Sequence, residues 1–134
     1  MTVSDRFVRA AVARYSQAPY SVKHWEVYSE PDCVSKLGVT CYAEWGSYPR
    51  EYASALEVAF RAAKAADPTA TVIMGSVAYD WFDVHPRRFL DEVLAAGAGP
   101  YFDVFGFNYF TLFAPVWAPY GADILGKVGA LSLS

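Results

Sequence analysis

The sequence has few of the features that mark several common classes of protein. Its 134 residues carry a net charge of −3 and no cluster of basic residues, which argues against nucleic acid as a partner. No uninterrupted apolar run approaches the roughly 20 residues of a transmembrane helix, so no membrane partner is expected. The N-terminus lacks the basic and then apolar pattern of a secretory signal. The localisation stays open, a secreted parent protein included.

Cysteine is also scarce. The two cysteines, Cys33 and Cys41, fall in one expected loop. They lack the CxxC spacing and the nearby histidine pair that a zinc site needs, so neither a metal nor another cofactor is expected. A disulfide that closes the loop and two free thiols are both compatible with this spacing, because a disulfide depends on the redox compartment.

Apolar and aromatic residues, in contrast, are abundant. They make up 54% and 17% of the chain, which argues against disorder and for one domain with a sizeable core. Ten Tyr, nine Phe and four Trp exceed the obvious needs of such a core. Two interpretations follow: an unusually aromatic core, or a cleft whose aromatic side chains bind the apolar faces of a ligand.

The pattern of apolar residues predicts alternating helices and strands. Apolar residues recur on one helical face in four segments: 5–15, 50–66, 86–96 and 121–131. Short apolar runs, typical of strands buried on both faces of a parallel sheet, occur at 22–28, 71–75 and 103–108. The fold class is therefore α/β, with three consecutive βα units in a single domain that covers residues 1–134.

Residues 31–48 are expected to form a long inserted loop between the first strand and the second helix. The segment contains several prolines and glycines and shows no sustained apolar period. Loops of this length are uncommon unless they are functional or disordered, and the aromatic residues here argue against disorder. A functional loop is the better interpretation.

The first expected strand delivers an acidic residue, Glu30, directly before Pro31. Since alternate residues of a strand share one face, His24, Glu26 and Tyr28 are expected on the same side of the sheet as Glu30. Glu30 would then stand at the rim, where nearby aromatic rings desolvate its carboxyl group and suit it to general acid catalysis. The alternative is a loop glutamate that pairs with a lysine or caps a backbone amide.

The residues around Glu30 resemble a known catalytic motif. Residues 25–32, W-E-V-Y-S-E-P-D, are similar to the W-E-[IV]-W-N-E-P-[ND] motif of clan A glycoside hydrolases, which are retaining glycosidases built on a TIM barrel. Residues 52–74 resemble the fourth helix and fifth strand of that clan, with its K-x-x-D-P turn, and residues 89–110 resemble the fifth helix and sixth strand. Families 5 and 39 have a similar layout. The resemblance covers nearly the whole chain, from the third barrel helix to the helix before the seventh strand.

The resemblance implies a partial (β/α)8 barrel from a hydrolase that acts on a β-linked carbohydrate. Glu30 matches the acid/base catalyst, which protonates the leaving oxygen and then activates the attacking water. Ser29, Asn108 and Tyr109 are expected to line the sugar subsite.

Two further aromatic residues, Tyr79 and Trp81, follow the second expected strand. If the resemblance holds, they lie on the catalytic face and can stack on sugar rings. The alternative, equally compatible with the sequence, is that they cover gaps in an unclosed barrel.

The sequence departs from the motif beside Glu30 and lacks a match for the second catalytic residue. Ser29 stands where the clan has an Asn that contacts the sugar 2-hydroxyl, and a hydroxyl offers fewer hydrogen bonds than an amide. The nucleophilic Glu lies on the seventh strand of the clan, and this chain ends about where that strand would begin. Because retaining hydrolysis needs two carboxyl groups about 5–5.5 Å apart, the chain alone is expected to be inactive.

A non-catalytic carbohydrate-binding or assembly module is the alternative function. Three parallel strands are too few to close a barrel. Two open sheet edges and an apolar face would then favour self-association.

Overall fold

The structure is a computed structural model that describes residues 2–41 and 44–132. Its parallel strands, β1 to β3, are His24–Ser29, Thr71–Val77 and Val104–Phe107. The helices α1 to α5 are Val3–Tyr15, Pro49–Ala66, Phe89–Ala95, Ala114–Trp117 and Asp123–Leu131. Single 3-10 turns, η1 to η4, are Trp45–Ser47, Gly99–Tyr101, Thr111–Phe113 and Ala118–Tyr120. The α/β class and the three parallel strands predicted from the sequence are confirmed.

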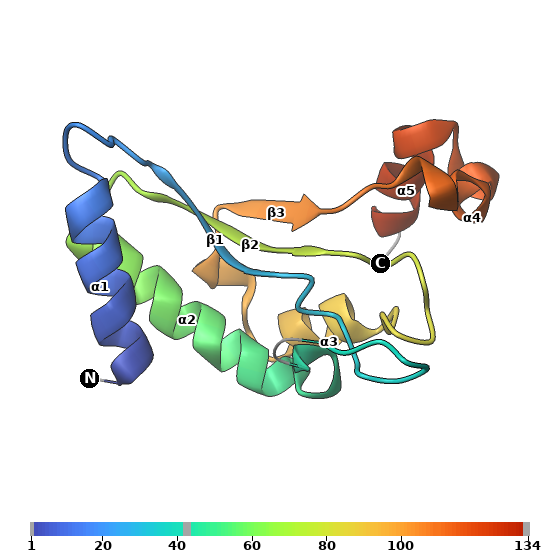
Figure 1. Cartoon of the computed structure of the whole chain (residues 1–134), viewed down its shortest axis with the longest axis horizontal. Helices are drawn as coiled ribbons and strands as arrows, with labels where there is room; N and C mark the ends of the chain where they lie inside the picture. The colour runs from blue at the N-terminus through green and yellow to red at the C-terminus, as the bar shows by residue number, and fades with distance from the viewer. Residues whose placement is uncertain (1, 42–43, 133–134) are drawn as a thin grey trace.

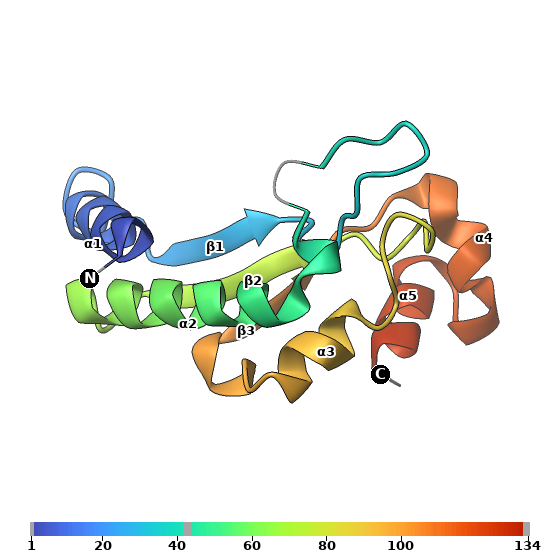
Figure 2. The same ribbon diagram turned by 90° about the horizontal axis from the view of Figure 1, so that it is seen from below.

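The three strands form one sheet of order β1-β2-β3. Helices α1, α2 and α3 lie on one face of this sheet, and α4 and α5 gather beyond the carboxyl ends of the strands (Figure 1). Figure 2 shows the same two groups of helices from the side that α1 to α3 cover. In the described part of the chain, no helix is long and apolar enough to cross a membrane.

Helix α2 packs closely on the sheet because its buried stripe consists largely of alanines. The stripe comprises Tyr52, Ala53, Leu56, Ala59, Ala62 and Ala63. Small side chains let the helix approach the strands, where Val72 and Met74 are fully buried beneath it. The packing of α2 supports the sheet, and the loops after each strand leave from the carboxyl edge of that sheet.

Strand β1 departs from regular alternation at Tyr28, whose φ is 67°. Its ring packs against Trp45 at a centroid distance of 5.6 Å, and Trp45 in turn packs against Tyr52 of α2. Tyr28 therefore turns toward the helical layer, and the prediction that it shares one face of the strand with His24 and Glu26 is wrong. The physical reason is the left-handed backbone, which breaks the two-residue period of a strand.

A tyrosine hydroxyl joins β1 and β2 next to this irregularity. The Tyr52 hydroxyl donates a hydrogen bond to the Val27 carbonyl at 3.0 Å and accepts one from the Gly75 N–H at 3.0 Å. A side chain on Gly75 would overlap the backbone oxygens of Val27 and Tyr28, so the close approach of the two strands requires glycine. The hydroxyl thus satisfies backbone groups that the strand ladder leaves unpaired.

The turn between α2 and β2 is held by Asp67. Its carboxylate accepts hydrogen bonds from the Lys23 ammonium at 2.6 Å and from the N–H and hydroxyl of Thr69 at 2.9 and 2.7 Å. The bond from Lys23, together with those from Thr69, holds the pKa of Asp67 well below its usual range. The first strand is thereby tied to the turn that precedes the second.

We expect Asp67→Asn to reduce the sensitivity of the fold to acid. Because the folded-state pKa of Asp67 lies below its unfolded value of about 3.9, its bonds stabilise the fold above that value and are lost as the pH falls through the folded-state pKa. Urea unfolding at about pH 7 and about pH 3 should show a smaller loss of stability on acidification in the variant than in the wild type. Asp83→Asn, which removes an exposed carboxylate, is the control. An equal loss in wild type and Asp67→Asn would contradict the prediction.

Candidate functional site

Glu30 lies directly after β1, at the carboxyl end of the sheet. Its N–H donates a hydrogen bond to the Ser76 carbonyl of β2 at 2.9 Å, which extends the strand pairing by one residue. Its φ of 49° then turns the chain before Pro31. A left-handed backbone is uncommon for glutamate, and such positions occur preferentially at functional sites.

The carboxylate of Glu30 meets a residue from the far strand. The side-chain amide of Asn108 donates a hydrogen bond to Oε1 of Glu30 at 2.9 Å, although the two residues are 78 positions apart. Asn108 follows β3 and is held by a bond from its own N–H to the Val77 carbonyl at 2.9 Å. The structure therefore brings together two of the predicted site residues at the carboxyl ends of the strands.

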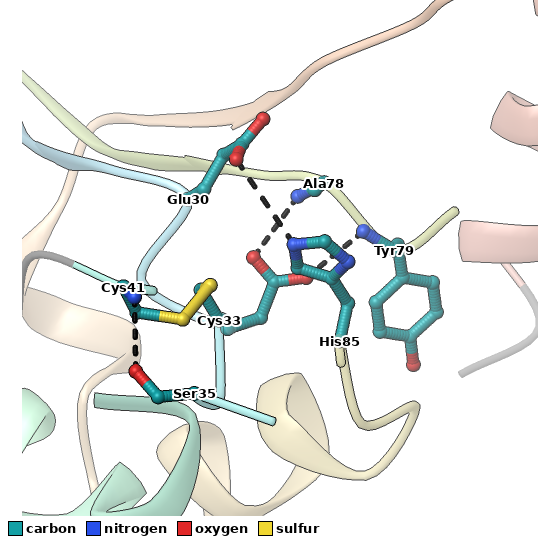
Figure 3. Close-up of a disulfide and its surroundings, with 8 residues drawn as sticks. Glu30, Cys33, Ser35, Cys41, Ala78, Tyr79 and His85 are labelled. Carbon is teal, nitrogen blue, oxygen red and sulfur yellow. Dashed lines mark hydrogen bonds and ion pairs between the residues drawn. A yellow bond between two sulfur atoms is a disulfide. The ribbon is translucent and has the colours of Figure 1, made fainter. Parts of the chain in front are cut away.

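His85 approaches the other carboxylate oxygen. Its Nε2 lies 4.0 Å from Oε2 of Glu30, and its imidazole is mostly buried (Figure 3). Within the described residues, Nδ1 of the same ring is buried and has no hydrogen-bond partner. The sequence did not single out His85, because a single histidine among aromatic residues carries no catalytic spacing.

Asp32 connects the loop after β1 to the loop after β2. Its fully buried carboxylate accepts hydrogen bonds from the N–H groups of Ala78 and Tyr79, both at 2.9 Å. Burial raises the pKa of Asp32, and the bond from Ala78 and the nearby His85 oppose that shift. Sequence reasoning missed this role. The sequence did contain a signal for it: Asp32 is a short acidic residue just after the first strand, where it can accept hydrogen bonds from backbone N–H groups that follow the neighbouring strand.

Three of the predicted site residues line one small pocket. This Glu30 pocket has a volume of about 170 Å³ and is lined by Ser29, Glu30, Cys33, Val39, Thr40, Cys41, Trp81, Val84 and His85. The Trp81 side chain is 41% exposed, so it offers a ring to a ligand. Ser29, Glu30 and Trp81 thus lie together, and their roles toward a sugar stay predictions.

The two cysteines form a disulfide, which decides between the alternatives that the sequence left open. The Cα atoms of Cys33 and Cys41 lie 5.9 Å apart, and Figure 3 shows the bridge next to Glu30 and His85. The loop expected over residues 31–48 contains this bridge and the turn η1. The loop is therefore structured around the Glu30 pocket over the residues that the structure describes.

Tyr79 lies in the core, and Tyr109 is partly buried against it; neither residue lines the Glu30 pocket. Tyr79 is 4% exposed, its ring stacks on Trp117 at a centroid distance of 6.5 Å, and its hydroxyl donates to the Arg87 carbonyl. The hydroxyl of Tyr109 is buried without a hydrogen-bond partner among the described residues, and burial raises its pKa. Both side chains take part in packing in this structure, and their expected contacts with sugar stay predictions.

A fully buried lysine ties α5 to the strand ends. The ammonium of Lys127 donates hydrogen bonds to Asp80 at 2.7 Å, to the Asn108 carbonyl at 2.5 Å and to the Ala78 carbonyl. The same Asp80 oxygen accepts the indole N–H of Trp117 at 2.8 Å. Desolvation lowers the pKa of Lys127, and the bond to Asp80 opposes this shift. The segments that carry Asn108 and Asp80 are held together by this ion pair.

Glu30 provides the one carboxylate among the described residues that line the pocket. Asp32 is bound to two backbone amides and Asp80 is paired with Lys127, so both carboxylates are buried and neither lines the pocket. The pocket can place the carboxyl group of Glu30, the hydroxyl of Ser29, the imidazole of His85 and the ring of Trp81 against a ligand.

Comparisons with known proteins do not assign a family to the chain. No family model matches it, and no curated protein matches it at a significant level. The function must therefore be inferred from the contacts of Glu30 and from the residues around it.

Proposed function

We propose that the chain is part of a retaining O-glycoside hydrolase that acts on a β-linked carbohydrate, with Glu30 as the acid/base catalyst. In this proposal the three βα units belong to a (β/α)8 barrel of the clan A type. The observation that supports it most strongly is the hydrogen bond between Glu30, after β1, and Asn108, after β3. Active sites of parallel barrels are built from residues at these carboxyl ends of the strands.

The proposed chemistry uses the two oxygens of Glu30 differently. The amide of Asn108 fixes Oε1, which leaves Oε2 beside His85 to carry the proton. Glu30 donates this proton to the glycosidic oxygen as the bond breaks, and in the second step it accepts a proton from the attacking water. The Ser29 hydroxyl and the Trp81 ring supply a polar and a stacking contact to the sugar.

A second carboxylate is needed for the complete reaction, and neither Asp32 nor Asp80 fits that role. Both carboxylates are buried: Asp32 accepts hydrogen bonds from two backbone amides, and Asp80 accepts one from the ammonium of Lys127. In our proposal the nucleophile belongs to a part of the parent protein outside these 134 residues. The chain by itself would then bind a sugar without hydrolysing it.

We expect Trp81→Ala to weaken sugar binding about tenfold, or about 1.4 kcal/mol, because the variant loses the apolar contact between the ring and the face of the sugar. Isothermal titration with β-linked gluco-, xylo- and mannobiosides measures the affinity. Tyr120→Ala, which removes another exposed aromatic ring on η4, should leave the affinity unchanged. If the wild-type chain binds none of these sugars, the proposal is wrong.

Hydrolysis of an aryl β-glycoside by the same samples tests whether the chain lacks the nucleophile. No turnover is expected from the chain alone. Turnover that disappears in Glu30→Gln would show that the 134 residues contain both carboxylates, contrary to the proposal for the nucleophile.

A non-catalytic module that assembles through its open edges is the second candidate. An apolar groove of about 700 Å³ lies between α1, β1 and α2, and exposed Phe7 borders it. The free edge of β1 carries unpaired backbone groups that a second copy of the same strand can pair in a two-fold dimer. Sedimentation of a monomer at high protein concentration would argue against this candidate.

An epoxyalkyl β-glycoside separates the two candidates chemically. In the hydrolase, the Glu30 carboxylate attacks an epoxide carbon, a C–O ester bond forms, the epoxide C–O bond breaks and the alkoxide takes a proton from water. A peptide carrying this ester at Glu30 supports acid/base placement, whereas an unmodified Glu30 in a sugar-binding chain supports the module.

A further inference from the structure

A short cross-linked loop forms one side of the Glu30 pocket. The disulfide joins Cys33 to Cys41, and Val39, Thr40 and Cys41 face the same pocket as Glu30. We refer to residues 39–41 as the pocket wall. Residues 39–41 belong to no helix or strand, so the position of the pocket wall depends on how the loop is anchored.

The base of the loop is fixed to the body of the protein. Cys33 is buried, and its N–H donates to the Glu30 carbonyl at 3.1 Å. The Val34 N–H donates to the Val84 carbonyl at 2.7 Å, and the Gly46 N–H donates to the Cys33 carbonyl at 3.1 Å. The base therefore moves together with the carboxyl ends of β1 and β2.

Among the residues that the structure describes, the tip of the loop makes no hydrogen bond to the body of the protein. In the described part of the chain, the hydrogen bonds of residues 36–41 run from Val39 N–H to the Lys36 carbonyl at 3.0 Å and from Cys41 N–H to the Ser35 hydroxyl at 2.9 Å, both inside the loop. The turn at the tip has φ of 54° at Leu37 and 81° at Gly38 and is exposed. The covalent link between the pocket wall and the buried base is the disulfide, and the hydrogen bond from the Cys41 N–H to Ser35 supports it.

We propose that the Cys33–Cys41 disulfide sets the size of the ligand that reaches Glu30. With the bridge closed, the pocket of about 170 Å³ lies below the roughly 300 Å³ at which cavities begin to hold drug-sized ligands, so it admits one compact group such as a single sugar unit. A dithiol reductant transfers two electrons and two protons, breaks the S–S bond, leaves two thiols and becomes a disulfide itself. The pocket wall is then released, and longer sugar chains enter.

The choice of a sugar as the ligand rests on the proposed function. The size limit that the pocket wall imposes does not depend on that function. Carbodiimide coupling of Glu30 to amines tests the wall without any sugar. Glycinamide is the small amine and glucosamine the large one, and exposed Glu51 on α2 is the internal reference in the same peptide digest. The oxidised chain should couple Glu30 to glycinamide several-fold faster than to glucosamine, and Glu51 should show no such preference.

Opening the loop should remove this preference. We expect the reduced chain and the double variant Cys33→Ser/Cys41→Ser to couple both amines at Glu30 at similar rates, and added reductant should change nothing in the double variant. Because loss of the bridge can loosen the chain more widely, a second variant keeps the bridge and trims the wall: Val39→Ala/Thr40→Ala. It should also lose the preference. Equal preferences in the oxidised, reduced and trimmed proteins would overturn the proposal.

Sugar binding forms the second arm of the experiment. The affinity for a β-linked tetrasaccharide relative to a methyl β-monosaccharide should rise about tenfold on reduction, as measured by titration. An unchanged ratio for sugars that do bind overturns the proposal. If no sugar binds in either state but the amine preference disappears on reduction, the wall is supported and the proposed glycosidase function is the part that fails.

Discussion

Lys127→Met is expected to lower the free energy of unfolding by about 3–5 kcal/mol, the usual cost of removing one partner from a buried ion pair. The Lys127 side chain is fully buried, and its ammonium makes three hydrogen bonds to groups after β2 and β3. Methionine fills the same space but leaves the Asp80 carboxylate charged and without its cation. The strand ends that carry Asn108 would lose their shared anchor.

Urea unfolding at neutral pH measures this loss. Lys36→Met, an exposed lysine in the loop tip, is the matched control and should cost less than about 0.5 kcal/mol. The double variant Lys127→Met/Asp80→Asn should recover much of the stability, because it leaves no unpaired charge while Asn can still accept the Trp117 indole N–H. A single variant as stable as Lys36→Met would contradict the burial and pairing of Lys127.

Tyr52→Phe is expected to cost about 2–4 kcal/mol, since each buried polar group left without a partner costs about 1–3 kcal/mol. The variant keeps the ring and removes only the hydroxyl. The Val27 carbonyl then loses its donor, and the buried Gly75 N–H loses its acceptor.

The matched control is Tyr48→Phe, at a tyrosine that is 53% exposed at the start of α2. Its stability should stay within about 0.5 kcal/mol of the wild type. Amide hydrogen exchange gives a local measurement, because the Gly75 N–H should exchange faster in Tyr52→Phe than in the control. Unchanged exchange at Gly75 would show that the hydroxyl is not the acceptor.

The positions of the strands followed from composition, but their ends did not. The predicted strand begins at Val22, yet β1 begins at His24 because the Val22 N–H bonds the Tyr15 carbonyl in the preceding turn. Strand β2 continues to Val77, past the predicted end at residue 75, because β1 and β3 continue beside it. The third helix begins at Phe89, since the Phe89 N–H bonds the Pro86 carbonyl in a turn. Hydrogen bonds between distant segments set these limits.

The site was predictable to the extent that it depends on strand direction. The resemblance to clan A implied that Glu30 and Asn108 lie in one site, and parallel strands make this contact possible because their carboxyl ends meet at one edge of the sheet. Asp32 and Lys127 could not be placed, because a single acidic or basic residue carries no period and its burial is decided by the partners it meets in the fold. For the same reason the left-handed turn at Tyr28 was not foreseen: tyrosine rarely adopts it without support from neighbouring groups.

The bond between Glu30 and Asn108 also has a consequence for the order in which the protein folds. It joins residues 78 positions apart, whereas the α2–β2 turn around Asp67 forms from near neighbours. Contacts of high sequence separation close large loops and form late. The hydrogen bond between Glu30 and Asn108 therefore forms only when β3 has docked beside β2. A ligand that bridges Glu30 and Asn108 binds the finished sheet and not its precursors, so its binding energy adds to the cooperativity of the whole unit.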